Sequence, residues 1–284
     1  ESAESGGDTP TPGGDALRAE ELEEKPAVVL TIRDADGDVV RRLRGPVTAG
    51  IHRVHWSLTY PSTDPWKPAD ELEDDPYASR AADDGVLVAP GTYTVHLATR
   101  VNGVLTDSGQ SQEFEVVPLR EGGTLPGSTP AETVAFTRDI AELKRAASGA
   151  RRVIADTRAS LVAIRETLDR SEVGAQSLRD RARSLELRVA AMQQSLAGNP
   201  RRELANDPGP VSIGQRLSVL GLGTDYSLAG PTDMHREIYG IVAEDLAELR
   251  ESLNRVVKTE LPALERELEA AGVPWTPGRA VPGE

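Results

Sequence analysis

The spacing of hydrophobic residues changes once along this chain, between residues 119 and 128. Before this stretch apolar residues alternate with polar ones, as in Leu30-Thr31-Ile32. After it they recur every three or four residues for most of the remaining chain. Alternation is typical of strands, and a spacing of three to four is typical of helices. The pattern therefore predicts an α+β protein in which an all-β domain and an all-α domain are separate, each with its own core.

Turn signals divide residues 27–118 into short segments of strand character. Frequent short antiparallel strands, about seven in all, predict an immunoglobulin-like β-sandwich. Residues 60–85 are too long for a hairpin turn, so we expect a long acidic loop there, at one end of the sandwich. The strongest hairpin signals are Asp36-Gly37, Pro90-Gly91 and Asn102-Gly103.

One of the expected strands starts at Gly50. In it Val54, Trp56 and Leu58 would share one face, because side chains two apart on a strand point the same way. This alternation predicts that Trp56 packs in the core instead of stacking on a ligand.

The helical half begins with a clear start signal. Thr129-Pro130-Ala131-Glu132 is a capping box with proline at the first helical position. From Phe136 to Leu168 apolar residues then step by fours and threes, which predicts one long helix. A second helix carries a stripe from Leu178 to Leu196, and Gly198 with Pro200 ends it.

Two further helices follow. Ser212-Ile213-Gly214-Gln215 is a weaker capping box that opens a short helix reaching Leu220. The last long helix starts near Thr232. In its apolar stripe, Leu253, Val257 and Leu261 are each four residues apart, and Pro262 follows directly. We expect a bend there, because proline cannot donate to the carbonyl four residues before it.

Three long helices and a short one can bury their apolar stripes by packing together as an antiparallel bundle. We therefore expect a bundle over residues 129–271, a hinge at 119–128 and a C-terminal tail at 272–284. Residues 1–26 are rich in Gly, Pro and acids and read as a flexible acidic linker. The start of the chain, which lacks a methionine, indicates a segment excised from something longer.

The charge of the chain is concentrated in two segments. The net charge is −14 over 284 residues, and residues 1–26 and 60–85 each hold eight acids and two bases. These two segments contribute −12, which leaves −2 for the rest. No basic face stands out that could bind nucleic acid. No apolar run approaches the roughly 18 residues of a membrane span, and cysteine is absent.

Two groups of residues resemble metal ligands. Asp34, Asp36 and Asp38 look like the opening of a calcium loop, but the glycine and glutamate that an EF-hand needs are missing, and a hairpin turn is the better interpretation. His52 and His55 would point to opposite faces of a strand, which argues against zinc. We assign no catalytic, cofactor-binding or metal-binding residue and expect no cofactor.

Two tryptophans lie outside the expected core. Trp66 sits in Asp64-Pro65-Trp66-Lys67-Pro68, within the acidic loop, where an aromatic either packs back on the sandwich or contacts a sugar or a partner. Trp275 follows the last helix and is expected to attach the tail to the bundle or the sandwich. Trp66 and Trp275 are the candidate ligand or partner contacts.

Several strings of the sequence carry a family resemblance. They include LTIRDADGDVVRRL, GIHRVHWSL, VAPGTYTVHL and FEVVPL, which resemble the immunoglobulin-like domain of flagellar hook-capping proteins. Joined to a helical region that ends in AAGVPWTPGR, they resemble the C-terminal region of large exported bacterial proteins. Those proteins carry sortilin-like or BNR-repeat (sialidase-type) β-propellers and are often labelled glycosyl hydrolases. The propeller repeats are absent here, so no catalytic residue is carried over.

The resemblance implies an accessory, non-catalytic C-terminal region of an exported protein, secreted or periplasmic. It would support an upstream β-propeller of the same polypeptide or mediate assembly. One alternative is a carbohydrate- or protein-binding module that uses the loop at 60–85. A second alternative is a part of a glycan-acting hydrolase whose active site lies upstream. Self-association through an unsatisfied helical stripe is a further hypothesis.

Overall fold

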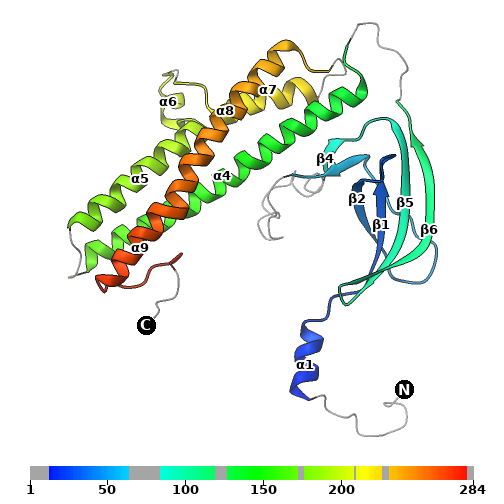
Figure 1. Cartoon of the computed structure of the whole chain (residues 1–284), viewed down its shortest axis with the longest axis horizontal. Helices are drawn as coiled ribbons and strands as arrows, with labels where there is room; N and C mark the ends of the chain where they lie inside the picture. The colour runs from blue at the N-terminus through cyan, green and yellow to red at the C-terminus, as the bar shows by residue number, and fades with distance from the viewer. Residues whose placement is uncertain are drawn as a thin grey trace. The chain divides into compact units, whose positions relative to one another are not determined.

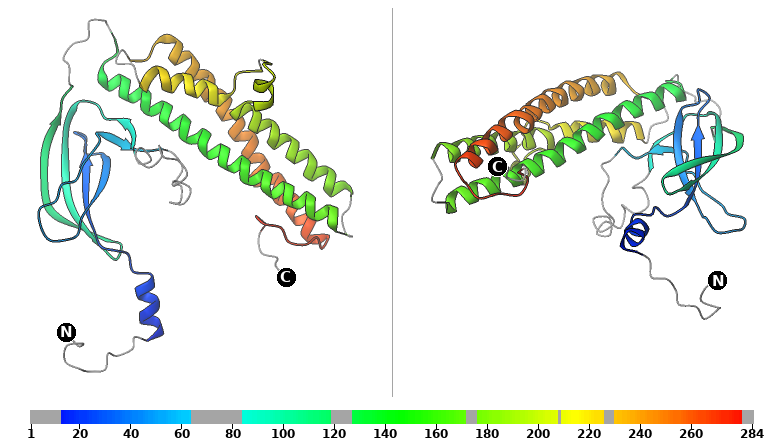
Figure 2. Two further views of the ribbon diagram at one scale, coloured as in Figure 1. Left: turned by 180° about the vertical axis from the view of Figure 1, so that it is seen from behind. Right: turned by 60° about the horizontal axis from the view of Figure 1, so that its bottom comes forward.

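The computed structural model describes residues 13–63, 84–118, 127–171, 176–207, 209–225 and 230–279. The chain divides into two compact units (Figures 1 and 2). The β unit contains residues 1–61 and 88–119, and the helical unit contains residues 62–87 and 120–284. The prediction of a mixed α+β chain, with antiparallel sheets followed by helices, is confirmed.

The β unit is built on a four-stranded antiparallel sheet with the strand order β2-β1-β5-β6. A short helix, α1 (Gly14–Glu21), precedes the sheet. The chain also contains a two-stranded sheet of β3 and β4, and β4 falls within the residue range of the helical unit. The strands are β1 (Ala27–Arg33), β2 (Val39–Gly45), β3 (Thr59–Pro61), β4 (Asp84–Leu87), β5 (Gly91–Val101) and β6 (Val104–Val116).

Two of the predicted turns join neighbouring strands of this sheet. Between β1 and β2, the Asp38 amide donates to Asp34 Oδ1 at 2.9 Å and the Gly37 amide donates to the Asp34 carbonyl at 3.0 Å. Between β5 and β6, Asn102 and Gly103 both have positive φ, 49° and 76°. Such values are required by a tight type I′ turn. The hairpin interpretation of the Asp34 loop is therefore confirmed.

The core of the β unit is small and aromatic. Ile32, Val40, Val88 and Tyr93 are its buried members. Trp56 packs edge-on against Tyr93 and Phe114, with ring centroids 5.7 and 6.0 Å apart. The predicted core role of Trp56 is thus confirmed.

The strand predicted from Gly50 onward is wrong. Residues 51–57 have no strand structure, and Leu58 adopts a positive φ of 59° that no strand contains. Leu58 is exposed, whereas Trp56 reaches the core and donates its indole N–H to the Thr59 carbonyl at 3.0 Å. The alternation of apolar residues was misleading here, because it does not supply the hydrogen-bonded neighbour that a strand requires.

The helical unit contains three rods. The first is α4 (Pro130–Arg170), 41 residues or about 60 Å at 1.5 Å per residue. The second consists of α5 (Gln176–Ala197) and, after a break, α7 (Ile213–Asp225); both lie along α4 (Figure 1). The third is the continuous run of α8 (Asp233–Arg255), η1 (Val256–Glu260) and α9 (Leu261–Ala270). A five-residue helix, α6 (Pro200–Leu204), lies in the break of the second rod.

The predicted start and stripe of α4 are confirmed. The Glu132 amide donates to Thr129 Oγ1 at 3.2 Å, and the Thr129 amide donates to Glu132 Oε2 at 2.7 Å. The buried residues of α4 include Phe136, Ile140, Leu161 and Leu168, which are members of the predicted stripe. They join one continuous core with the buried residues of α5, α7, α8 and α9.

The irregularity expected before Pro262 takes the form of the π-helical turn η1. The Leu261 amide donates to the Val256 carbonyl, five residues back. This wider turn buries Val256 completely and leaves Val257, the residue predicted on the stripe, only partly buried. A π-helical turn absorbs one extra residue, so the core stripe can continue from Leu253 through Val256 to Leu261.

The tail returns to the helical unit after α9. The Gly272 amide donates to the Glu269 carbonyl at 2.9 Å and the Val273 amide to the Leu268 carbonyl at 3.0 Å, which is a Schellman ending. This confirms the predicted helix end. Buried Val273 and Thr276 then attach the tail to the bundle. No helix in the described ranges is both long and apolar enough to span a bilayer.

Candidate functional site

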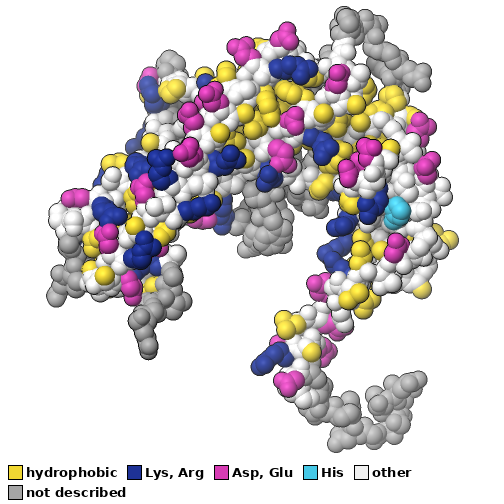
Figure 3. Space-filling model, in the orientation of Figure 1, with side chains coloured by type: hydrophobic (Ala, Val, Ile, Leu, Met, Phe, Trp, Pro, Cys, Tyr) yellow, Lys and Arg dark blue, Asp and Glu magenta, His cyan; other side chains and the backbone are white. Residues whose placement is uncertain are grey.

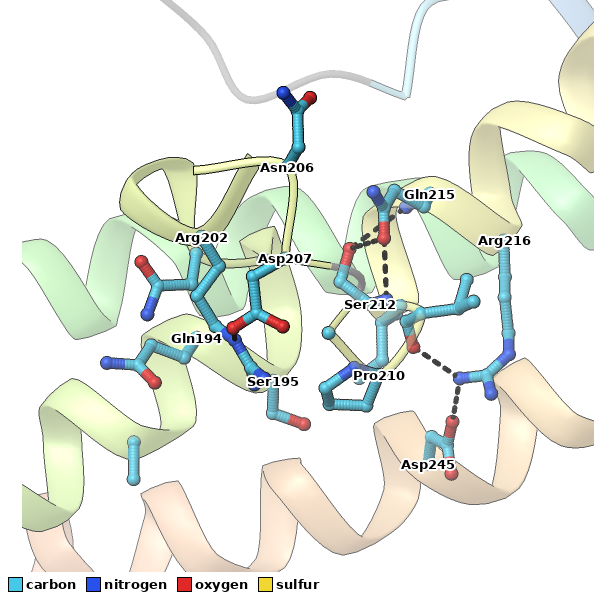
Figure 4. A pocket seen from close by; sticks show the side chains of 16 residues that line it. Gln194, Ser195, Arg202, Asn206, Asp207, Pro210, Ser212, Gln215, Arg216 and Asp245 are labelled. Atoms are coloured by element: carbon cyan, nitrogen blue, oxygen red, sulfur yellow. Dashed lines mark hydrogen bonds and ion pairs between the residues drawn. The ribbon is translucent and has the colours of Figure 1, made fainter. Parts of the chain in front are cut away.

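A cleft of about 1120 Å³ opens where the second rod of the helical unit is interrupted between α5 and α7. Figure 4 shows side chains from four places pointing around it. They come from the end of α5, the α6 loop, the start of α7 and the middle of α8. The labelled residues are Gln194, Ser195, Arg202, Asn206, Asp207, Pro210, Ser212, Gln215, Arg216 and Asp245.

Local sequence explains the break. Gly198 ends α5 with a φ of 84°, and its amide donates to the Gln194 carbonyl at 2.8 Å. The Asn199 side chain then accepts the Arg201 amide at 3.1 Å and starts α6. The predicted capping box opens α7: the Gln215 amide donates to Ser212 Oγ at 3.2 Å, and the Ser212 amide donates to Gln215 Oε1 at 2.9 Å.

The charged side chains of the cleft are paired with one another. Arg202 donates to Asp207 at 2.7 Å within the α6 loop. Arg216 on α7 donates to Asp245 on α8 at 2.9 Å and to the Val211 carbonyl at 3.0 Å. Each cation thus meets an acid at hydrogen-bond distance, and the cleft has no excess of either sign.

The side chains that line the cleft do not form a catalytic group. Ser195 and Ser212 supply hydroxyls, but no histidine lines the cleft to act as their base. Within the described ranges, no cluster of three or more His, Cys, Asp or Glu could hold a metal ion. What the arrangement can do is accept a polar chain or ligand through the amides of Gln194 and Asn199.

The predicted contact residues lie elsewhere. Trp66 is outside the described residues. Trp275 does not line the cleft and is 51% exposed in the tail, between two buried residues, Val273 and Thr276. Val273, Thr276 and Arg279 are buried beside it, and the role expected of Trp275 in attaching the tail stays a prediction.

The histidines and aspartates considered as metal ligands have other positions. His52 Nε2 lies 2.6 Å from the Thr48 carbonyl on the exposed segment after β2, and His55 is also exposed. Both follow an irregular chain, so the argument from opposite strand faces does not apply. Asp34 uses its side chain to close the hairpin turn.

Arg279, in the tail of the helical unit, is a buried charge. Its side chain is 3% exposed and donates to Glu269 at 2.6 Å and to the Pro274 carbonyl at 3.1 Å. Gly278 lets the chain pass α4 closely, since a Cβ there would lie 2.6 Å from Ser160 Oγ. Nearby, burial raises the pKa of Glu265, an effect that Arg279 partly opposes.

A second electrostatic feature lies at the π-helical turn. Arg188 on α5 forms a two-point ion pair with Glu260 on η1. The hydrogen bond from Arg188 lowers the pKa of Glu260, and the same bond raises the pKa of Arg188. This pair joins the second and third rods.

The cleft was not predicted from the sequence. The signal that could have located it is the interruption of the apolar stripe between Leu196 and Ile213 by glycine, proline and asparagine. The partner from α8, Asp245, lies far along the chain and has no local signal.

No protein-family model, no curated protein and no solved structure matches this chain. The resemblance to propeller-bearing exported proteins and to hook-capping proteins stays a prediction.

Proposed function

We propose that this chain is a non-catalytic accessory region of a larger exported protein, and that it supports a β-propeller of that protein or mediates its assembly. The observation that carries the proposal is that the charged and polar side chains of the cleft between α5 and α7 are engaged with one another. Arg202 pairs with Asp207, Arg216 pairs with Asp245, and Ser212 caps α7 together with Gln215. Groups engaged in this way stabilise the fold and are not held ready for a reaction.

The architecture supports the same proposal. The three rods of the helical unit bury their apolar stripes against one another. A long bundle of this kind can act as a spacer between other parts of a protein. The buried tail closes the end of α9 with an internal ion pair, which adds rigidity. The proposal also includes an immunoglobulin-like identity for the β unit, supported by its antiparallel sheet and by the tryptophan in its core.

Two measurements test the proposal. The reading frame that encodes residue 1 should continue upstream into an export signal and propeller repeats. If the upstream sequence holds an export signal alone, the accessory assignment is wrong.

The second measurement is a hydrolase assay on the purified chain with a panel of aryl glycosides and polysaccharides. We expect no turnover above that of an Arg216→Met, Asp245→Asn double variant, whose cleft lacks the interhelical pair. Turnover by the wild-type chain that the double variant lacks would contradict the non-catalytic assignment.

A further inference from the structure

A patch of exposed apolar side chains lies on the outer side of α7 and α8. We define the α7–α8 patch by five members: four exposed side chains, Val219, Leu222, Met234 and Ile241, and Ile238, which is partly buried and also packs against the core. Leu222 is 68% exposed and Met234 is 57% exposed, and because single exposed apolar side chains are common, it is the adjacency of these residues that marks the patch. Figure 3 shows hydrophobic side chains gathered over this part of the helical unit, with acidic and basic side chains around them.

The members of the patch are contiguous because α7 and α8 pack closely and antiparallel. Gly223 of α7 lies against the His235 ring of α8, so closely that a Cβ at Gly223 would be 2.3 Å from Nε2. Further along the pair, Arg216 of α7 meets Asp245 of α8 at 2.9 Å.

Between these two contacts, helical spacing aligns the apolar residues of the two helices. Met234, Ile238 and Ile241 form a single stripe along α8 that leads to Asp245. On α7, Val219 lies one turn from both Arg216 and Gly223, so it is opposite that stripe, and Leu222 lies one turn from Val219. The patch therefore follows the line along which α7 and α8 pack against each other.

The charge around the patch is acidic on one side. Glu237 and Glu244 follow Met234 and Ile241 by three residues, which places them on the outer edge of the stripe. Both are exposed, and neither is paired with a described cation. The cation beside the patch, Arg216, is already paired with Asp245.

From this combination we infer that the α7–α8 patch binds an amphipathic helix of a partner protein, whose apolar face covers the patch and whose flank carries lysine or arginine. A helix that lies along two packed helices extends the packing of the bundle and buries residues at i, i+3, i+4 and i+7. The basic flank would meet Glu237 and Glu244. The inference does not depend on the propeller assignment, because it rests on the surface of the helical unit alone.

Size and charge argue against a second copy of this chain as the occupant. A patch of five side chains is on the order of 300–400 Å², typical of a functional patch on a monomer. A stable dimer buries about 800 Å² on each partner. A second copy would also bring its own Glu237 and Glu244 to a surface that already carries the same two acids. An anionic membrane would meet the same repulsion.

The test uses model peptides and the full chain. The probes are two fluorescein-labelled 18-residue helical peptides with the same leucine face, one flanked by lysine and the other by glutamate. Binding is measured by fluorescence anisotropy at 150 mM salt. We expect the lysine peptide to bind at least about tenfold more tightly than the glutamate peptide.

Variants locate the binding. A Leu222→Ser, Ile241→Ser double variant should bind the lysine peptide at least about tenfold more weakly than the wild-type chain does. A matched control, Val153→Ser with Leu187→Ser, removes exposed apolar side chains from α4 and α5 and should leave binding unchanged. A Glu237→Lys, Glu244→Lys double variant should reverse the preference between the peptides. Circular dichroism checks that each variant keeps its helix content.

Several results would overturn the inference. One is the absence of binding by the wild-type chain, as expected if another part of the chain covers the patch. Another is equal loss in the control variant, which would indicate unspecific attraction. A third is sedimentation of the wild-type chain as a dimer that the Leu222→Ser, Ile241→Ser variant abolishes, because the occupant would then be a second copy.

Discussion

The two units of this chain build their cores from different side chains. In the described part of the helical unit, 24 buried hydrophobic residues form one cluster, nearly all of them aliphatic. In the β unit, four buried residues form the main cluster, and half-buried Trp56 and Phe114 pack against it. In the long helical stripes, many aliphatic side chains each supply a modest share of the buried apolar area. In the small sheet, a few large aromatic rings supply much of it.

This difference predicts where each unit is sensitive. The helical unit should lose stability in proportion to the volume removed at the centre of its stripe. The β unit should depend on its ring cluster. The following experiments can break or sharpen this comparison, and hydrogen exchange read by mass spectrometry measures each unit separately.

The largest loss is expected from Leu161→Ala in the middle of α4. Leu161 is completely buried, so the truncation removes transfer energy and leaves a cavity, which costs about 3–4 kcal/mol of unfolding free energy. Exchange should accelerate in the helices and not in the strands. The control is Leu187→Ala on α5, the same truncation at an exposed position, with an expected loss within about 0.5 kcal/mol. Equal losses in both variants would show that the stripe does not carry the stability.

The second loss is expected from Trp56→Ala in the β unit. Trp56 is only half-buried, but it packs edge-on against Tyr93 and Phe114. We therefore expect the substitution to lower the unfolding free energy by about 2–3 kcal/mol. Exchange should accelerate in β1 and β5. Trp275→Ala serves as the control, because it removes an indole from the helical unit. If Trp56→Ala left strand exchange unchanged, the ring cluster would not be the main support of the sheet.

A smaller loss is expected from Arg279→Met in the tail. The change removes charge-assisted hydrogen bonds to Glu269 and to the Pro274 carbonyl while keeping most of the apolar volume, at a cost of about 2 kcal/mol. The backbone amides of residues 273–279 should exchange with solvent faster than those of α9. Arg266→Met, on the exposed side of α9, is the matched control. An unchanged tail would assign its anchoring to Val273 and Thr276 alone.

The smallest effect concerns the pH dependence of the helical unit. Arg188 lowers the folded pKa of Glu260, so the stability from this pair is present above the ordinary glutamate pKa and is lost as the pH falls through the lowered value. The contribution of so exposed a pair is below about 1 kcal/mol. The difference in stability between the wild-type chain and Glu260→Gln should therefore shrink from pH 6 to pH 3, measured by urea unfolding.

Glu265→Gln is the control of opposite sign. Burial raises the folded pKa of Glu265, so its contribution is present below the ordinary glutamate pKa and is lost as the pH rises through the raised value. The unfolding free energy of the Glu265→Gln variant, relative to that of the wild-type chain, should therefore increase as the pH rises. If both variants changed in the same direction with pH, net charge and not the two local environments would control the profile.

The helices of this molecule were predictable because their signals are local. The capping box at Thr129, the glycine after α9 and the stripe of α4 each lie within a few turns of the elements they define. The strand expected over residues 51–57 was wrong because a strand needs a neighbour in register, and alternation alone does not supply one. The contact expected at Trp66 lies outside the described residues and stays a prediction.

The candidate sites depended on distant parts of the chain. The cleft joins Arg216 to Asp245, and the α7–α8 patch combines residues of two helices, so neither could be read from one segment. Gly223 shows the same limit: its sequence context is an ordinary helical glycine, and its role becomes clear only beside His235.

The amino-acid sequence by itself determined the class of each half, the hairpin turns at Asp34 and Asn102, and the starts of α4, α7 and α8. These features depend on backbone hydrogen bonds and hydrophobic periods that a few neighbouring residues specify. Only the tertiary structure decided that α5 and α7 form one interrupted rod, that η1 buries Val256 in place of Val257, and that Arg279 is buried in the tail. The physical reason is that burial and ion pairing are properties of surfaces that meet, and the chain brings those surfaces together only when it folds.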